Sequence, residues 1–315
     1  AANIKMSAAS VISLGFDGEC IMKSNISLKK KAFYFLTFAG PSVVFFVLVV
    51  IIPLIYGVYL TFTDWNGLSN DMNFVGIANY IATFQDIEFW KSLGLTVLYS
   101  VISVITINVV AFALAWLLTT GIKGQNFLRA GFFTPNLIGG LILGYVWQFL
   151  FSRVLVNLHD VISISLFERS WLSSPGTAFA ALIIVTTWQY SGYMLLIYIS
   201  GFLGVPTDLI EAAKVDGATE GKITRFIRFP LMMPSVVICL FLSITRTFKV
   251  YDLNLSLTEG GPYGATKMAA MHIYTKAFEE YRYGIGQAEA LIFFVVIAAI
   301  ALTQTYLGKK KEVEI

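Results

Sequence analysis

The residues whose types and spacing suggest a specific interaction lie in a charged segment between two long apolar stretches. Glu211, Ala212 and Ala213 precede Asp216 and Gly217, a pair typical of turns. The two alanines permit close approach of another surface, and Glu211 offers a charge that a partner can pair. Apolar residues three or four positions apart on both sides of the turn predict a helix–turn–helix. The segment is therefore either an amphipathic link between the two stretches or a docking element for a soluble protein.

The sequence offers little for catalysis by the chain itself. A phosphate loop needs the pattern G-x-x-x-x-G-K-[S/T], and the nearest approach, 217–223, is one residue short and ends in Ile223. We therefore expect no ATP hydrolysis and no cofactor in this chain. His159 and His272 have no companion at metal or catalytic spacing and are placed in outer loops. The two cysteines are far apart, so neither a metal site nor a disulfide is predicted.

The composition excludes most water-soluble classes of protein. The 315 residues are 57% hydrophobic and 13% charged, whereas a soluble domain has roughly 45–50% apolar and about 25% charged residues. So few charges cannot cover that much apolar surface in water, which argues against a soluble enzyme or a disordered regulator. The net charge of +3 is too small to imply a nucleic-acid partner. The expected partner is the lipid bilayer.

Six charge-free stretches are long enough to span a bilayer, and each is expected to hold one helix. Their runs of consecutive apolar residues do not alternate as barrel strands do. The predicted fold class is therefore an all-α membrane protein with six transmembrane helices. No acidic residue falls within these stretches, and Arg246, at the end of the fifth, is expected to snorkel to the surface. The stretches are 32–63, 92–122, 130–152, 170–207, 229–245 and 290–308.

Basic residues set the expected orientation. With the N-terminus inside, the inner segments hold 14 of the 22 Lys and Arg residues, including the runs at 29–31 and 309–311. Both termini are therefore expected to be cytoplasmic. The predicted organisation is a tail at 1–31, of which 1–21 reads as an alternative start or an extension, and a membrane domain at 32–308. That domain contains an inner loop at 203–229 and an outer loop at 249–287, and a second tail follows at 309–315.

Aromatic and hydrogen-bonding residues within the spans are candidates for a sugar path, because sugars bind aromatic faces and a few polar groups. The same residues also serve commonly as interfacial anchors and as bonds between helices. Asn108 is interpreted as such a bond, and Gly139, Gly140 and Gly144 as sites of close helix packing. The path candidates are Trp188, Gln189, Tyr190, Tyr193, Gln148, Thr245 and Asn254.

The charged inner segment resembles the EAA motif of permease subunits in bacterial binding-protein-dependent ABC importers. The resemblance rests on the run from Glu211 to Ala218, on Pro230 and on Pro234, while Phe229 departs from the usual leucine. A second resemblance, to the outer loop of carbohydrate-importer permeases, rests on Leu257-Thr258-Glu259-Gly260-Gly261-Pro262. Further similar pieces, such as the run 60–65, point to the first permease of maltose-type, multiple-sugar and glycerol-phosphate importers.

This resemblance implies a type I importer permease in the bacterial inner membrane, with a cytoplasmic coupling helix pair between helices four and five. The implied partners are two ABC ATPase subunits that carry Mg-ATP, a second and distinct permease, and an extracytoplasmic sugar-binding protein. Gly260, Gly261 and Pro262 would take part in outer gating or docking. The implied coupling residues are Glu211, Ala212, Ala213, Asp216, Gly217 and Pro230.

Three alternatives stay open at this point. The chain can be a permease of a non-sugar ABC importer, in which case the outer-loop similarity is a coincidence. It can be a secondary transporter driven by an ion gradient, although that function calls for acids within the membrane. A structural membrane subunit without a conducted substrate is the third.

Overall fold

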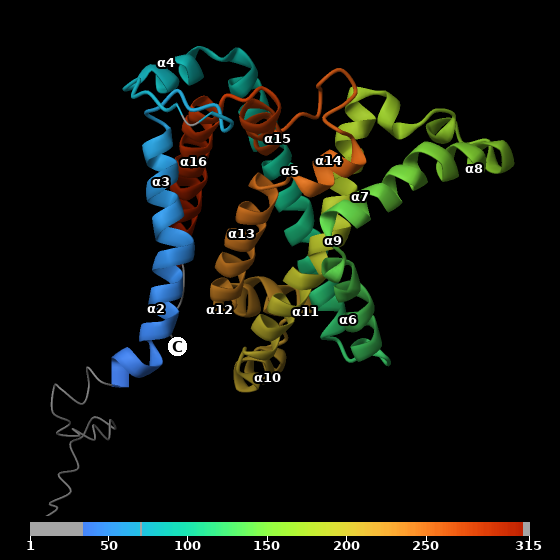
Figure 1. The fold of residues 1–315 in the computed structure, drawn as a ribbon. Coiled ribbons are helices and arrows are strands. Elements are labelled where there is room, and N and C mark those ends of the chain that lie inside the picture. Colours follow the sequence, from blue (N-terminus) through green and yellow to red (C-terminus); the bar gives the residue numbers. More distant parts are fainter. Residues whose placement is uncertain (1–33, 70, 311–315) are drawn as a thin grey trace, which may run out of the picture. The chain divides into compact units, whose positions relative to one another are not determined.

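The computed structural model describes residues 34–69 and 71–310, which form helices joined by short connections (Figure 1). Within these ranges the only strand-like pairing is an isolated bridge between Thr63 and Phe74. The predicted N-terminal tail and residues 311–315 of the C-terminal tail lie outside the described residues.

The elements follow one another along the chain, with η marking 3-10 and π segments: α2 (Gly40–Phe46), η1 (Val47–Ile51), α3 (Ile52–Leu60), α4 (Ala78–Gln85), α5 (Ile87–Leu118), α6 (Gln125–Phe133), η2 (Thr134–Leu137), α7 (Gly140–Phe149), η3 (Leu150–Val154), α8 (Leu155–Ile162), η4 (Ser165–Phe167), η5 (Trp171–Ser173), α9 (Pro175–Leu203), α10 (Thr207–Val215), α11 (Glu220–Ile223), η6 (Thr224–Arg228), α12 (Phe229–Leu231), α13 (Met233–Phe248), α14 (Asp252–Leu257), α15 (Ala269–Tyr274), η7 (Thr275–Glu279) and α16 (Tyr283–Lys309).

The chain divides into two compact units, with the boundary between Ile55 and Tyr56. The first unit contains α2, η1 and the beginning of α3. Pro41 lies in the first turn of α2, where its missing N–H leaves no helical bond unmade. Apart from Gly40 and Ser42, the side chains of α2 and η1 are apolar, as a lipid-facing helix requires.

Within the described residues, five helices are long and apolar enough to cross a membrane, and a bent pair makes a sixth span. This confirms the expected all-helical fold, and the predicted number of six spans is reached when the bent pair is counted as one span. The straight spans are Gly40–Leu60, Ile87–Leu118, Gly140–His159, Pro175–Leu203 and Tyr283–Lys309, and the bent pair is Glu220–Leu231 with Met233–Phe248.

The third apolar stretch does not form one helix, contrary to the sequence prediction. It begins within α6, breaks at η2, and resumes as α7, which continues through η3 into α8 (Figure 1). Pro135 lies at the start of η2, and Gly139 has an extended backbone with ψ 143°. A proline without an N–H followed by an extended glycine ends the helical bonding there. His159 accordingly lies in α8 and not in an outer loop.

The second unit is organised around α5 and α9, which pack along each other and against α13. A polar bridge joins all three helices: the amide of Asn108 donates to Ser243 at 3.0 Å, and the hydroxyl of Tyr198 donates to Asn108 at 2.7 Å. In an apolar surrounding, such bonds satisfy the polar groups and fix the register of the helices. The predicted role of Asn108 is confirmed.

Two glycines let α14 approach α7 closely. A Cβ at Gly144 would lie 1.8 Å from the Ser256 hydroxyl, and one at Gly140 would lie 2.9 Å from the Cβ of Asp252. A Cβ at Gly139 would meet nothing within 4 Å. The predicted close packing is therefore confirmed for Gly140 and Gly144 and is wrong for Gly139.

We expect Gly144→Val to separate α14 from α7, because the new side chain occupies the space of Ser256. Overpacking of this kind costs about 1–3 kcal/mol, which lowers the melting temperature of the purified permease by roughly 5 °C. Gly139→Val is the matched control and is expected to leave that temperature unchanged. Equal melting temperatures for the two variants would contradict this packing of α14 on α7.

Candidate functional site

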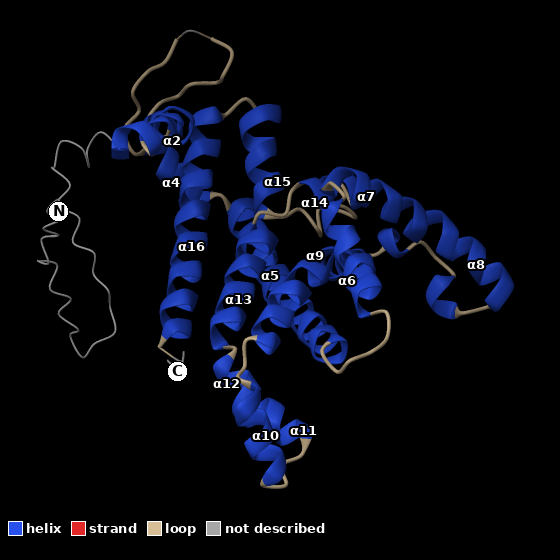
Figure 2. Cartoon of the chain, turned by 90° about the horizontal axis from the view of Figure 1, so that it is seen from below, coloured by secondary structure: helices blue, strands red, loops and turns tan. Residues whose placement is uncertain are grey.

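The predicted coupling residues lie on a helix that the rest of the chain leaves uncovered. α10 contains no buried residue, and Glu211 and Ala212 are exposed while Ala213 is half-buried. Figure 2 shows α10 and α11 together beyond α12, at the tip of this part of the unit. Val215 keeps 88% of its surface exposed and Phe226 keeps 68%. An uncovered helix with apolar and charged side chains is a surface that suits a protein partner.

The turn after α10 depends on a glycine. Gly217 has φ +78°, a left-handed conformation that side-chain-bearing residues adopt only at a cost. The N–H of Gly217 donates to Lys214 O, and the N–H of Ala218 donates to Ala213 O, so carbonyls at the end of α10 are satisfied. The predicted turn at Asp216-Gly217 is therefore present, and it reverses the chain within two residues.

Ion pairs hold the two helices of this segment together. One carboxylate oxygen of Glu220 lies 3.1 Å from Lys214 of α10, and the other lies 3.0 Å from Arg228 of η6. Ile223, only 1% exposed, anchors α11 from the inside. Exposed ion pairs contribute little to stability individually, but these two share one carboxylate and link α10, α11 and η6.

The charge-free stretch 229–245 predicts a fifth helix that begins next to Pro230, but the helical segment there begins earlier. The helix that starts at Glu220 runs continuously through Pro230 to Leu231 and meets α13 at a 72° bend. Pro230 lies in the first turn of α12 and Pro234 in the first turn of α13. Met232, at the bend, is buried. A continuous helical segment, Glu220–Leu231, therefore lies between α10 and the base of α13.

At the other end of α13, a charged group lies between aromatic rings. The guanidinium of Arg246 lies 4.9 Å from the ring centre of Tyr190 and 4.8 Å from that of Tyr193. It also donates to the side-chain oxygen of Asn136 at 2.7 Å. Arg246 lies in the last turn of α13, where the sequence places it, and it is half-buried against Tyr190, Tyr193 and Asn136.

Gln189 and Gly192 bring α9 against the break in the third stretch. The side-chain amide of Gln189 is buried and donates to Ile138 O at 3.1 Å. A Cβ at Gly192 would lie 1.8 Å from Phe132 O, so only glycine allows this approach of the two backbones. Because the helix is interrupted between α6 and α7, the carbonyl of Ile138 can accept a hydrogen bond from Gln189. The same interruption places Asn136 within hydrogen-bond distance of Arg246.

Arg246, Tyr190, Tyr193 and Asn136 form what we call the Arg246 cluster. The remaining path candidates lie outside it. Trp188 packs edge-on against Trp147 and lines a different groove, of about 410 Å³, with residues of α5. The hydroxyl of Thr245 donates to carbonyls of its own helix, and Gln148 lies half-buried on α7. Asn254 is fully buried and bonds the backbone of Thr266, so no solute reaches it in this conformation.

Hydrogen bonds from Thr266 stabilise the outer loop that contains Gly260, Gly261 and Pro262. The hydroxyl of Thr266 donates to Gly261 O at 2.6 Å, and its N–H donates to Gly260 O at 3.1 Å. Gly260 has φ +75°. Tyr263 is 99% exposed beside this turn. The loop is thus an ordered turn that presents an aromatic side chain to the outside of the unit.

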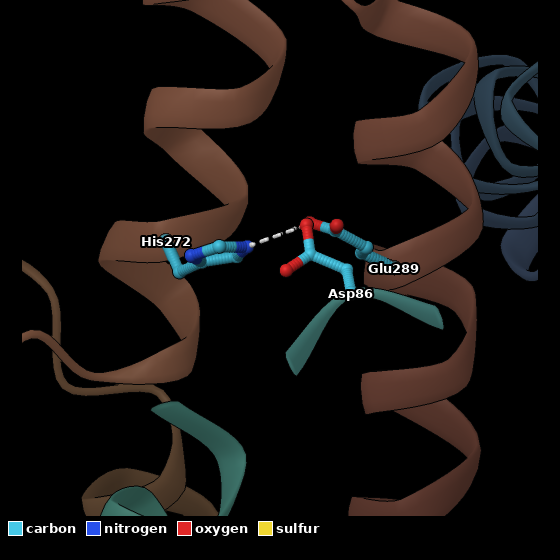
Figure 3. Close-up of side chains that lie close together, drawn as sticks. All are labelled: Asp86, His272 and Glu289. Atoms are coloured by element: carbon cyan, nitrogen blue, oxygen red, sulfur yellow. Dashed lines mark ion pairs between the residues drawn. The ribbon is translucent and has the colours of Figure 1, made fainter. Parts of the chain in front are cut away.

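The structure brings together a buried group of charged residues that the sequence did not predict. His272 is buried on α15 and not in an open loop, and it lies beside Asp86 and Glu289 (Figure 3). One ligand atom from each of these three residues lies within 4.8 Å of the other two. The expectation that His272 has no companion is therefore wrong, since its companions come from distant parts of the chain. Glu289 also places an acid inside a spanning helix, contrary to prediction.

Asp86 connects this group to Lys276. The ammonium of Lys276 lies 3.0 Å from Asp86, and the other Asp86 oxygen accepts the N–H groups of Glu88 and Phe89 at the start of α5. Burial raises the pKa of Asp86, but the hydrogen bonds from Lys276 and the backbone outweigh it and hold the pKa below its ordinary value. Asp86 is therefore ionised at neutral pH.

Comparisons with known proteins agree with this architecture. The family described as "Binding-protein-dependent transport system inner membrane component" matches residues 89–313. The "probable starch degradation products transport system permease protein AmyD" of Thermoanaerobacterium thermosulfurigenes is 42% identical over 285 residues, covering 90% of this chain and 97% of the relative. The "multiple sugar-binding transport system permease protein MsmF" of Streptococcus mutans is 31% identical, covering 83% and 90%.

A solved structure shows the same fold. A chain of a bacterial ABC transporter involved in the import of the acidic polysaccharide alginate superposes with a TM-score of 0.76 at 18% identity, covering 89% of this chain and 96% of that one. The chain therefore belongs to the binding-protein-dependent transport system inner membrane components, with the all-helical fold of an ABC importer permease.

Proposed function

We propose that this chain is a permease subunit of an ATP-driven importer of oligosaccharides such as those released from starch. The observation that carries the proposal is the uncovered α10, which α11 joins to a helical segment that ends at the base of α13, the helix that carries Arg246 at its other end. The 42% identity to a permease named for starch degradation products supports the class of substrate. The chain is then a transport subunit and not an enzyme.

The proposed assembly places an ATPase subunit against α10, with Glu211, Ala212, Ala213, Asp216 and Gly217 at the contact. Mg-ATP binds that partner, because this chain has no phosphate loop. Two such ATPase subunits, a second and distinct permease, and an extracytoplasmic binding protein complete the importer. Both termini face the cytoplasm of the bacterial cell, since the basic residues of the chain favour that side.

The translocation path is proposed to pass the Arg246 cluster. Tyr190 and Tyr193 offer aromatic faces for sugar rings, and the guanidinium has five N–H donors, one of which bonds Asn136. The predicted path residues Trp188, Gln148, Thr245 and Asn254 are not needed in this arrangement. Because Arg246 lies on α13 and both tyrosines lie on α9, movement of α13 changes the shape of the site. That movement links ATP hydrolysis to access.

Reconstitution tests this function. We expect proteoliposomes containing this permease with its companion permease, ATPase and binding protein to accumulate radiolabelled maltotriose when ATP is enclosed. Addition of an ionophore should leave uptake unchanged, and neither a labelled amino acid nor phosphate should be taken up. Uptake that needs an ion gradient, or that selects an amino acid, would contradict the proposal.

A further inference from the structure

The group formed by Asp86, His272 and Glu289 joins three separate segments of the chain. Asp86 precedes α5, His272 lies on α15, and Glu289 lies in the second turn of α16 (Figure 3). The Nε2 atom of His272 lies 3.6 Å from Oε2 of Glu289 and 3.8 Å from Oδ2 of Asp86. These distances are too long for hydrogen bonds. They are close to the separation of about 3.4 Å between ligand atoms around a tetrahedral zinc ion with bonds near 2.1 Å.

Two members of the group are buried without a hydrogen-bond partner. The side chain of Glu289 is 0% exposed, and neither of its oxygens has a partner among the described residues. Nε2 of His272, whose side chain is 5% exposed, also has none within the described ranges. A buried carboxylate without a partner is strongly disfavoured. Because these atoms point toward one another (Figure 3), a positive species between them would satisfy all of them.

The charged side chains around this group do not balance one another. Lys276 pairs with Asp86 at 3.0 Å and also with Glu280 at 3.2 Å. A histidine that ligates a metal is neutral and carboxylate ligands are ionised, so in a metal-bound state the three carboxylates and one ammonium would sum to two negative charges. A divalent cation would balance them. Lys276 has a second acceptor in Glu280, so it can release Oδ2 of Asp86 without losing its own ion pair.

We propose that His272, Glu289 and Asp86 bind a divalent transition-metal ion through one imidazole nitrogen and two carboxylates. This mixed nitrogen and oxygen set suits zinc and also manganese. Oδ2 of Asp86 is the ligand atom, since Oδ1 caps α5. A water molecule completes the coordination. The ion would join α15 of the outer loop to the starts of α5 and α16, and would stabilise this end of the permease.

The test uses the full importer complex, purified through a tag without histidine, stripped with EDTA and exchanged into metal-free detergent buffer. After incubation with ZnCl₂ or MnCl₂ and a second exchange, bound metal is counted by mass spectrometry. We expect about one ion per copy of this chain, and a rise in melting temperature of about 5 °C at a large excess of the ion. If neither ion binds, the proposal is overturned.

Variants distinguish this site from others in the complex. Glu289→Gln keeps the shape of the side chain, and the new amide can donate to His272, so this variant should fold. We expect Glu289→Gln and His272→Gln each to lose the ion and the thermal shift. His159→Gln changes the chain's other histidine and should keep both. Metal retained by Glu289→Gln and His272→Gln, or lost equally by His159→Gln, would place the ion elsewhere and refute the assignment.

Discussion

Glu211→Lys is expected to leave the importer assembled while ATP-driven sugar uptake falls below a tenth of that of the unchanged protein. Glu211 is exposed on α10 and makes no ion pair within the described chain, so its replacement should not disturb the fold. In the proposed complex it faces the ATPase subunit, and reversal of its charge puts a like charge or an unpaired one at that contact. Such changes cost several kcal/mol at a buried interface.

The measurement pairs uptake into proteoliposomes with ATPase activity stimulated by the sugar-loaded binding protein. We expect both to fall together, while size-exclusion chromatography gives an unchanged amount of assembled complex. Asp71→Lys supplies the same change of charge at an exposed loop far along the chain from α10, and it should retain uptake. Normal uptake by Glu211→Lys would show that α10 is not the coupling surface.

The spans could be predicted from the sequence because lipid imposes one simple rule, that long charge-free stretches form helices. The rule fails where the protein itself accommodates a charged group. The last span begins at Tyr283, seven residues before the predicted stretch, because Glu289 lies inside the helix and does not mark its end. Asp86 and His272 surround Glu289 from distant positions, and no spacing in the sequence shows that they meet.

Local signals are reliable where a few neighbouring residues decide the structure. The pair Asp216-Gly217 predicts a turn, and Gly217 has the positive φ that a turn of this kind uses. Pro230 is a less reliable signal, because the helical segment that contains it begins ten residues earlier, at Glu220, and a π segment precedes the short α12 in which Pro230 lies. The 72° bend two residues later lies at Met232, between Pro230 and Pro234, and prolines are a common cause of sharp bends in helices.

Arg246 shows that a charge next to a span can have partners that its position in the sequence does not reveal. The fifth stretch ends at this residue, and a long basic side chain at the end of a span commonly reaches for water. In this protein Arg246 also contacts two tyrosine faces and Asn136. A useful signal was present, because Tyr190 and Tyr193 are three residues apart on one helix and can flank one cation.

Arg246→Met is expected to raise the apparent KM for sugar uptake at least tenfold while the basal ATPase activity of the complex remains. Methionine keeps much of the length and apolar stem of arginine, so the gap between α9 and α13 stays filled. The change removes every N–H donor from between Tyr190 and Tyr193 and leaves Asn136 without its 2.7 Å partner. A hydrogen bond to a charged group contributes about 1.5–3 kcal/mol, which corresponds to roughly a tenfold or greater loss of affinity.

Two further variants separate binding from a general effect of charge. Lys249→Met removes an exposed positive charge three residues further along the chain and should leave the KM unchanged. Arg246→Lys keeps the charge but loses the planar fork that stacks on the rings, so it should show an intermediate KM. If Arg246→Met lowered uptake and basal ATPase activity equally, Arg246 would support the packing of α13 and not the sugar. An unchanged KM in Arg246→Met would show that the sugar does not bind at Arg246, Tyr190, Tyr193 and Asn136. In this group the Arg246 guanidinium is the part of α13 that contacts both α9 and the segment between α6 and α7.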